Sequence, residues 1–135
     1  MSCSEVRARP RLPLAAALLA LCAAASAATY TAPSGYFQIV GYQLQRVERD
    51  GRMELQVGGW VQALANCRSA VLLFDVLDRA GAPVGAIRIT HGAFFRHDRW
   101  TLGPGEFTPR GGDAAAAIAA AHSVEVREAE CTATR

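Results

Sequence analysis

Apolar and polar residues alternate along much of this chain, and this alternation is the feature that most constrains its fold. In the segment 53–64 (MELQVGGWVQAL), one side of an extended chain carries Met53, Leu55, Val57, Gly59, Val61 and Ala63, and the other carries Glu54, Gln56, Gly58, Trp60 and Gln62. A period of two residues predicts a half-buried strand with an apolar inner face. That face has to be covered by a second layer of structure.

Further strands are predicted on either side of this segment. Residues 36–47 (YFQIVGYQLQRV) are predicted to form a strand. Asp50-Gly51 lies between this segment and the segment 53–64, and it predicts that the two pair as an antiparallel hairpin. Residues 70–77 are largely apolar on both faces, as in a central strand, and 78–83 (DRAGAP) predict a turn. Residues 84–95 (VGAIRITHGAFF) resume the strand pattern, 102–106 (LGPGE) predict a reversal, and 122–131 (HSVEVREAEC) predict the last strand.

The segment 111–123 (GGDAAAAIAAAHS) departs from the alternation. Alanine is the strongest helix former, and Asp113 is a good N-cap, so a short helix near 113–121 is one interpretation, crossing from one sheet to the other. The other is that the alanines reflect a general bias in composition, and the sequence leaves helix and strand both open there. Short strands with turn signals at this spacing predict an all-β, antiparallel immunoglobulin-like sandwich.

The N-terminal segment predicts export. Arg7, Arg9 and Arg11 precede an apolar run from Leu12 to about Ala25, and a small-x-small site ends at Ala27, so residues 1–27 are expected to form a cleaved signal peptide. The apolar run is shorter than the roughly 20 residues of a membrane span. A lipid anchor on Cys22 is disfavoured because bulky Leu21 precedes it. Residues 28–135 are then one domain, expected in the periplasm of a Gram-negative bacterium or outside the cell.

Charge and cysteine content restrict the domain further. All 14 basic residues of the chain are arginines, and residues 28–135 carry 11 of them against 11 acidic residues, so the domain is about neutral. Nucleic-acid binding is disfavoured because it needs a clustered positive surface. Cys67 and Cys131 are predicted to form a disulfide, as an even cysteine number in an exported protein favours. Their spacing lacks the C-x-x-C of zinc sites.

The segment 74–78 (FDVLD) contains two carboxylates, Asp75 and Asp78. Residues three apart on a strand leave opposite faces, so the pair is not expected to share acid and base roles. We expect Asp78 to open a turn by accepting backbone N–H groups, and Asp75 to lie on the outer face near an arginine.

The same segment resembles a known family. Phe74-Asp75-Val76-Leu77-Asp78 is similar to the Phe-x-Leu-Tyr-Asp motif of bacterial FxLYD-type domains, with Leu77 in place of the tyrosine. Gly81, the Leu102–Glu106 turn, and the segment 57–67 with Asn66 also resemble that family, over roughly residues 53–130. The resemblance implies an immunoglobulin-like sandwich of an exported protein and attaches no catalytic residue to the motif.

The segment 88–100 (RITHGAFFRHDRW) is the candidate ligand or anion-binding patch. Its candidate residues are cationic or aromatic, and they are Arg88, His91, Arg96, His97, Arg99 and Trp100. A simpler interpretation is a solvated loop in which Phe95 and Trp100 plug the edge of the sandwich. His91 and His97 could hold a metal only if His122 or Asp98 joined them.

No catalytic motif is present. Ser34, Ser69 and Ser123 lie outside any G-x-S-x-G sequence, and no phosphate-binding glycine loop occurs, so an enzyme is not expected and no cofactor is predicted. The sequence therefore predicts a small exported binding or structural module for an unknown protein or cell-envelope ligand. Two alternatives are a periplasmic metal-handling protein using the 91–97 histidines and an inhibitor that docks onto a secreted enzyme.

Overall fold

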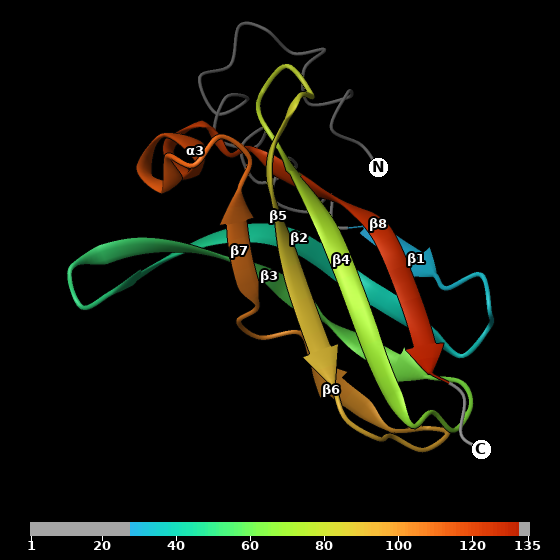
Figure 1. Ribbon diagram of the computed structural model, residues 1–135. Coiled ribbons are helices and arrows are strands. Elements are labelled where there is room, and N and C mark those ends of the chain that lie inside the picture. The colour runs from blue at the N-terminus through green and yellow to red at the C-terminus, as the bar shows by residue number, and fades with distance from the viewer. Residues whose placement is uncertain (1–27, 133–135) are drawn as a thin grey trace, which may run out of the picture.

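The computed structural model describes residues 28–132, and they form a sandwich of two antiparallel sheets (Figure 1). The first sheet has the order β1-β2-β3-β6 and the second the order β7-β5-β4-β8. The strands are β1 (Ala28–Thr31), β2 (Phe37–Arg49), β3 (Arg52–Ala63), β4 (Ser69–Leu77), β5 (Pro83–His91), β6 (Arg99–Thr101), β7 (Glu106–Pro109) and β8 (Ser123–Thr132). The predicted all-β antiparallel sandwich is confirmed. The predicted signal peptide and Cys22 lie outside the described residues.

Alternating side chains from both sheets fill the space between them. Phe37, Ile39, Val57 and Val61 of the first sheet and Leu72, Phe74, Val76 and Ile87 of the second are fully buried. Each such side chain stabilises the fold by roughly 1.5–3 kcal/mol relative to an exposed one. On β4 the alternate residues face outward and are only half-buried, so this central strand is covered on one face rather than two.

Asp75 and Asp78 have the architectural roles that strand geometry predicts. Asp75 lies on the outer face of β4, and the guanidinium of Arg127 on β8 donates to its carboxylate at 2.5 Å. This hydrogen bond raises the pKa of Arg127. Oδ1 of Asp78 accepts the backbone N–H groups of Ala80 and Ala82, both at 2.9 Å, and so closes the turn between β4 and β5.

The hairpin of β2 and β3 extends well beyond the rest of the first sheet (Figure 1). β1 pairs with β2 only as far as Tyr42, and β6 pairs with β3 only from Trp60 to Gln62, so residues 43–58 form a two-stranded ribbon. Its turn is Asp50-Gly51, and both residues have positive φ angles (54° and 77°), as a type I′ turn requires. The predicted hairpin is confirmed.

A β-bulge lies at the base of this ribbon. The register of β2 against β3 shifts between Val40 and Gln43, opposite Gly59, whose φ is +116°. A Cβ at Gly59 would lie 2.8 Å from the carbonyl oxygen of Val40, so glycine is required there. Bulges bend and twist a strand, and this one redirects the ribbon away from the sandwich.

The helical interpretation of the alanine-rich segment is confirmed. Helix α3 (Ala114–Ala120) begins at Asp113, whose Oδ1 accepts the N–H of Ala116 at 3.1 Å. The expected path from one sheet to the other is wrong, because α3 links β7 and β8, the two edge strands of the second sheet. The chain crosses between the sheets in residues 64–68 from β3 to β4, in residues 92–98 from β5 to β6, and in residues 102–105 from β6 to β7.

Candidate binding surface

The loops at one end of the sandwich, the lower end in Figure 1, form a surface that we call the loop end. It consists of residues 64–68, which follow β3, and residues 92–98, which follow β5. The predicted disulfide between Cys67 and Cys131 is present there and joins the first loop to the end of β8. Cys67 and Phe94 also exchange both backbone hydrogen bonds at 2.9 Å, so the two loops are bound to each other.

Residues 95–98 form a tight turn within the loop end. The N–H of Asp98 donates to the carbonyl of Phe95, and Oδ2 of Asp98 accepts the N–H of Phe95 at 2.8 Å. Oδ1 of Asn66 accepts the N–H of Arg96 at 2.9 Å from the neighbouring loop. Ala63 donates its N–H to the carbonyl of Asp98 at 2.8 Å. The backbone of the turn is therefore held from both sides and from within.

Two adjacent phenylalanines leave this turn in opposite directions. Phe94 is buried and packs edge-on against Phe37 in the core, with 6.0 Å between ring centroids. Phe95 is 65% exposed, and Leu64 on the neighbouring loop is 39% exposed. The interpretation of Phe95 as a plug for the sandwich edge is wrong, because Phe94 has that role. Phe95 is the most exposed large apolar side chain among the described residues.

His91 and Trp100 cover Phe94 from the solvent side. Their rings stack at 3.8 Å between centroids with an interplanar angle of 14°, and both rings lie about 6 Å from the Phe94 ring. Nδ1 of His91 donates to the carbonyl of Gly92 at 3.0 Å. The indole N–H of Trp100 is buried without an acceptor in the part of the chain that the structure describes. His91 and Trp100 therefore belong to the packed edge of the sandwich.

Three exposed arginines lie on the loop end or directly beside it. Arg96 follows Phe95 directly, and the other two are Arg68 and Arg99. The guanidinium of Arg99 lies 4.0 Å from the ring centroid of Trp60, a cation–π contact that restrains the arginine. The loop end thus presents an exposed apolar side chain on a hydrogen-bonded backbone, with exposed arginines and the exposed Asp98 on the same surface.

The remaining candidates of the 88–100 segment do not form one site with these residues. Arg88 lies in the middle of β5 and is exposed, while its neighbours Ile87 and Ile89 face the core, so it projects from the outer face of the second sheet. His97 is exposed in the turn with a φ of 79°, a left-handed conformation that is costly for a residue with a Cβ.

The three histidines do not converge. His91 pairs with Ala70 at one end of β4, and His122 precedes Ser123, which pairs with Leu77 at the other end. Seven residues of strand separate the two positions by roughly 24 Å. No group of three or more potential ligands that could hold a metal occurs in residues 28–132. The suggested His91, His97 and His122 set is therefore not assembled.

Comparisons with protein-family models, curated proteins and solved structures gave no match for this chain. The similarity to FxLYD-type domains stays a prediction. None of the helices in the described range is long and apolar enough to cross a membrane.

The sequence alone does not show that Phe95 and Leu64 are exposed apolar side chains. The pattern GAFF does not show which phenylalanine faces the core, because the strand β5 ends at His91, before either of them. Asn66 was noted only for the family resemblance, although its carboxamide fixes Arg96 across 30 residues of sequence.

Proposed function

We propose that this protein is an exported binding module that docks onto a partner protein through the loop end. The observation that supports this proposal best is Phe95, an apolar side chain that is 65% exposed on a backbone fixed by hydrogen bonds. Aromatic and arginine side chains dominate the energetics of protein interfaces, especially where little conformational entropy is lost on binding. The partner would offer an apolar pocket for Phe95 with acidic groups around it.

Export is the second element of the proposal. The disulfide between Cys67 and Cys131 supports it, since disulfides persist in oxidising compartments and are rare in the cytosol. The N-terminal sequence supports it as well, because residues 1–27 have the three regions of a signal peptide. Mass spectrometry of the protein from a fractionated host tests it directly. A mature N-terminus at Ala28 in the periplasm or medium is expected, whereas intact residues 1–27 in the cytosol would contradict export.

Photo-crosslinking from position 95 tests the docking surface. We expect a photoreactive phenylalanine analogue at position 95 to capture a discrete partner in living cells. The same analogue at Thr90, an exposed residue of β5, is the matched control and should capture none.

Affinity measurements with the captured partner then decide the role of the side chain. Phe95→Ala is expected to weaken binding at least tenfold, as for a hot-spot residue, without a change in the free energy of unfolding. Arg96→Glu should slow association more than it speeds dissociation, because rim charges steer the encounter. A Phe95→Ala variant that binds like the original protein would refute the proposal.

A further inference from the structure

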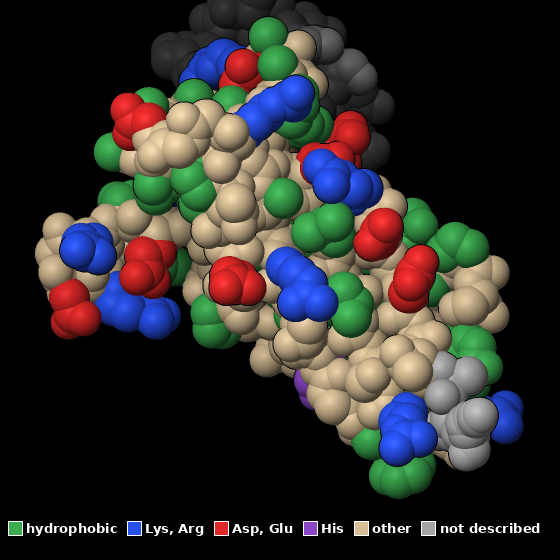
Figure 2. Space-filling model, viewed as in Figure 1, with side chains coloured by type: hydrophobic (Ala, Val, Ile, Leu, Met, Phe, Trp, Pro, Cys, Tyr) green, Lys and Arg blue, Asp and Glu red, His purple; other side chains and the backbone are tan. Residues whose placement is uncertain are grey.

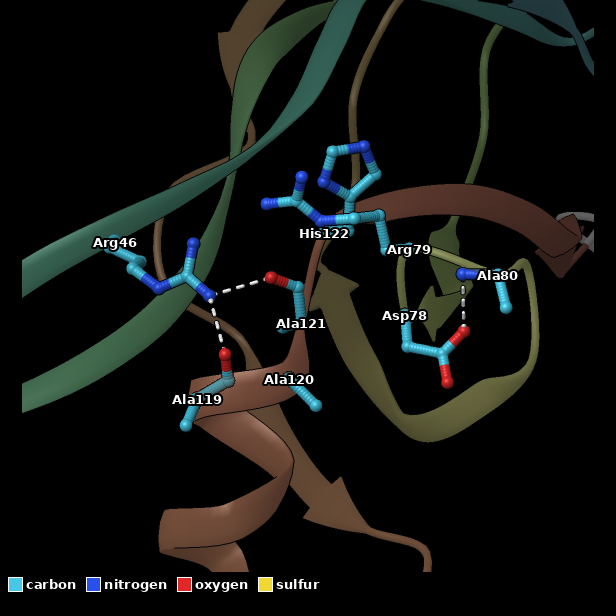
Figure 3. Close-up of a pocket in the computed structure, with 8 residues that line it drawn as sticks. All are labelled: Arg46, Asp78, Arg79, Ala80, Ala119, Ala120, Ala121 and His122. Carbon is cyan, nitrogen blue, oxygen red and sulfur yellow. Dashed lines mark hydrogen bonds between the residues drawn. The ribbon is translucent and has the colours of Figure 1, made fainter.

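A cavity of about 440 Å³ lies at the opposite end of the sandwich from Phe95 (Figure 3). It is formed where β2, the turn between β4 and β5, and the junction of α3 with β8 meet. Arg46, Arg79 and His122 line this space from three separate elements (Figure 3). The backbone N–H of His122 donates to the carbonyl of Leu77 at 2.8 Å, which fixes the start of β8 beside the turn.

The helix carbonyls hold Arg46 in place. Its Nη2 donates to the carbonyl of Ile118 at 2.9 Å and to that of Ala121 at 2.6 Å, at the negative end of α3. Its other guanidinium nitrogens have no hydrogen-bond partner within residues 28–132, and neither do the side chains of Arg79 and His122. The arginine is therefore preorganised, with donors left over.

The balance of charge in this cavity favours an anion. Asp78 is the acidic residue in its lining, and one of its carboxylate oxygens already accepts the N–H groups of Ala80 and Ala82. Two guanidinium groups that face one space repel each other unless an anion lies between them. A phosphate or carboxylate group satisfies such donors with charge-assisted hydrogen bonds.

A second cavity of about 520 Å³ adjoins the first and shares Arg46 and Ala119 with it. It lies between α3 and the projecting hairpin, and its other lining residues are Arg52, Met53, Ala114, Ala115 and Ile118. Met53 is 46% exposed, and hydrophobic side chains cover α3 on the side that faces the hairpin (Figure 2). Apart from the arginines, these side chains have no hydrogen-bonding group, so the lining offers few side-chain partners for a peptide backbone.

We propose that these two cavities together bind a single-chain anionic amphiphile. The phosphate or carboxylate head group lies between Arg46, Arg79 and His122, and the alkyl chain follows the apolar cavity past Ala119 and Ile118 toward Met53. An alkyl chain fits this groove because it needs no hydrogen bonds and gains free energy from each buried methylene.

Titrations of the purified protein with four probes test this proposal. Octyl phosphate and octanoate, below their critical micelle concentrations, should both bind. The one that binds more tightly shows whether the head group is a phosphate or a carboxylate. Inorganic phosphate should bind at least tenfold more weakly, because it lacks the chain. Octyltrimethylammonium should bind at least tenfold more weakly than octyl phosphate, because its head group is cationic. Amide chemical shifts at Ala119 and His122 locate the site.

Substitutions separate the two halves of the site. Arg79→Ala should weaken octyl phosphate binding about tenfold, while Arg88→Ala, which removes an equal charge from the middle of β5, should not change it. Met53→Ser should weaken octyl phosphate binding several-fold and leave inorganic phosphate binding unchanged. Both Arg79 and Met53 are exposed, so the variants should fold, as circular dichroism will verify.

Three results would overturn the proposal. The first is that neither octyl anion binds in the millimolar range at a tenfold molar excess or more. The second is that octyl phosphate and inorganic phosphate bind with equal affinity. The third is that an acidic peptide binds more tightly than both octyl anions.

Discussion

Removing the disulfide is the sharpest test of how this small domain is stabilised. Cys67 and Cys131 are 64 residues apart in sequence, and the closed loop contains β4, β5, β6, β7, α3 and β8. In the chain-entropy model, a loop of this length stabilises the folded state by about 4 kcal/mol, because the cross-link restricts the unfolded chain. A domain of this size has a net stability of about 5–15 kcal/mol, so the loss should be large.

The experiment replaces both cysteines by alanine and follows urea unfolding by fluorescence and circular dichroism. Alanine is preferred to serine because Cys67 is buried, and a hydroxyl there would need a hydrogen-bond partner. We expect the free energy of unfolding to fall by about 4 kcal/mol. The m-value should rise, because the unfolded chain without its cross-link exposes more surface.

The reduced original protein is the control for this variant. It should lose about the same free energy as the double alanine variant, since both lack the cross-link and differ only in two thiol groups. A loss below about 1 kcal/mol with an unchanged m-value would refute the reasoning. It would mean that the unfolded chain is already compact around this pair of residues, so that the bond restricts little.

Four smaller perturbations test other parts of the fold. Gly59→Ala should lower the free energy of unfolding by at least about 2 kcal/mol, because Gly59 has a φ of +116° and an added Cβ would clash with backbone. Gly92→Ala is the control, because the space around Gly92 is open, and it should change the free energy of unfolding by no more than about 0.5 kcal/mol. Urea unfolding measures both variants. Asp113→Ala should lower the free energy of unfolding by about 1 kcal/mol, because it removes the N-cap of α3. Asp113→Asn should lower it much less, because asparagine is also a good N-cap. His97→Gly should stabilise the protein by about 1 kcal/mol by relieving a φ of 79°, and a destabilisation would show that the histidine ring itself contributes. Burial raises the pKa of Tyr42 above its ordinary value of 10.0, and the negative charge of Glu125 raises it further. The stability that depends on this group should therefore be intact below pH 10 and fall as the pH rises through the folded-state pKa. Tyr42→Phe should abolish this part of the pH dependence of unfolding.

The strands that sequence reasoning found are those whose pattern follows from one local rule. The alternation of apolar and polar residues predicts β3 and β4. Asp50-Gly51 predicts the hairpin turn, because both residues tolerate the positive φ angles that the turn requires. β1 was missed, because its four residues lie at a sheet edge and only Tyr30 is even partly buried. β6 was missed for a similar reason, since three residues are too few to show a period.

Bulges limit how far alternation can assign the inward face of a strand. On β8, Val124 and Val126 lie on one face, as alternation predicts, but the register against β4 shifts at Arg127. Beyond that shift the buried residue is Ala129, an odd-numbered position. A bulge adds one residue and inverts the inward side, and no simple sequence rule locates it.

The candidate sites were the hardest to predict, because each depends on contacts between distant segments. The backbone of the turn at Phe95 is held by Ala63 at the end of β3 and by Asn66 in the loop after it, about 30 residues earlier in the sequence. Arg46 and Arg79 line the same cavity for two reasons. A bulge redirects the β2–β3 hairpin that carries Arg46, and the capped helix α3 returns the chain beside the β4–β5 turn that carries Arg79. Residue types in one segment could suggest anion binding, but only the three-dimensional arrangement shows which arginines lie together.

The two ends of the sandwich are stabilised in different ways, and this difference fits the two proposals. At the loop end, a disulfide and paired backbone hydrogen bonds fix the loops, so Phe95 can contact a partner with little loss of entropy. At the other end, a two-stranded ribbon without a third strand is marginally stable by itself, and the side-chain hydrogen bonds that link it to the carbonyls of α3 come from Arg46. A ligand bound between the ribbon and α3 would add contacts where the protein has few. Binding there should therefore order the ribbon and leave the loop end unchanged.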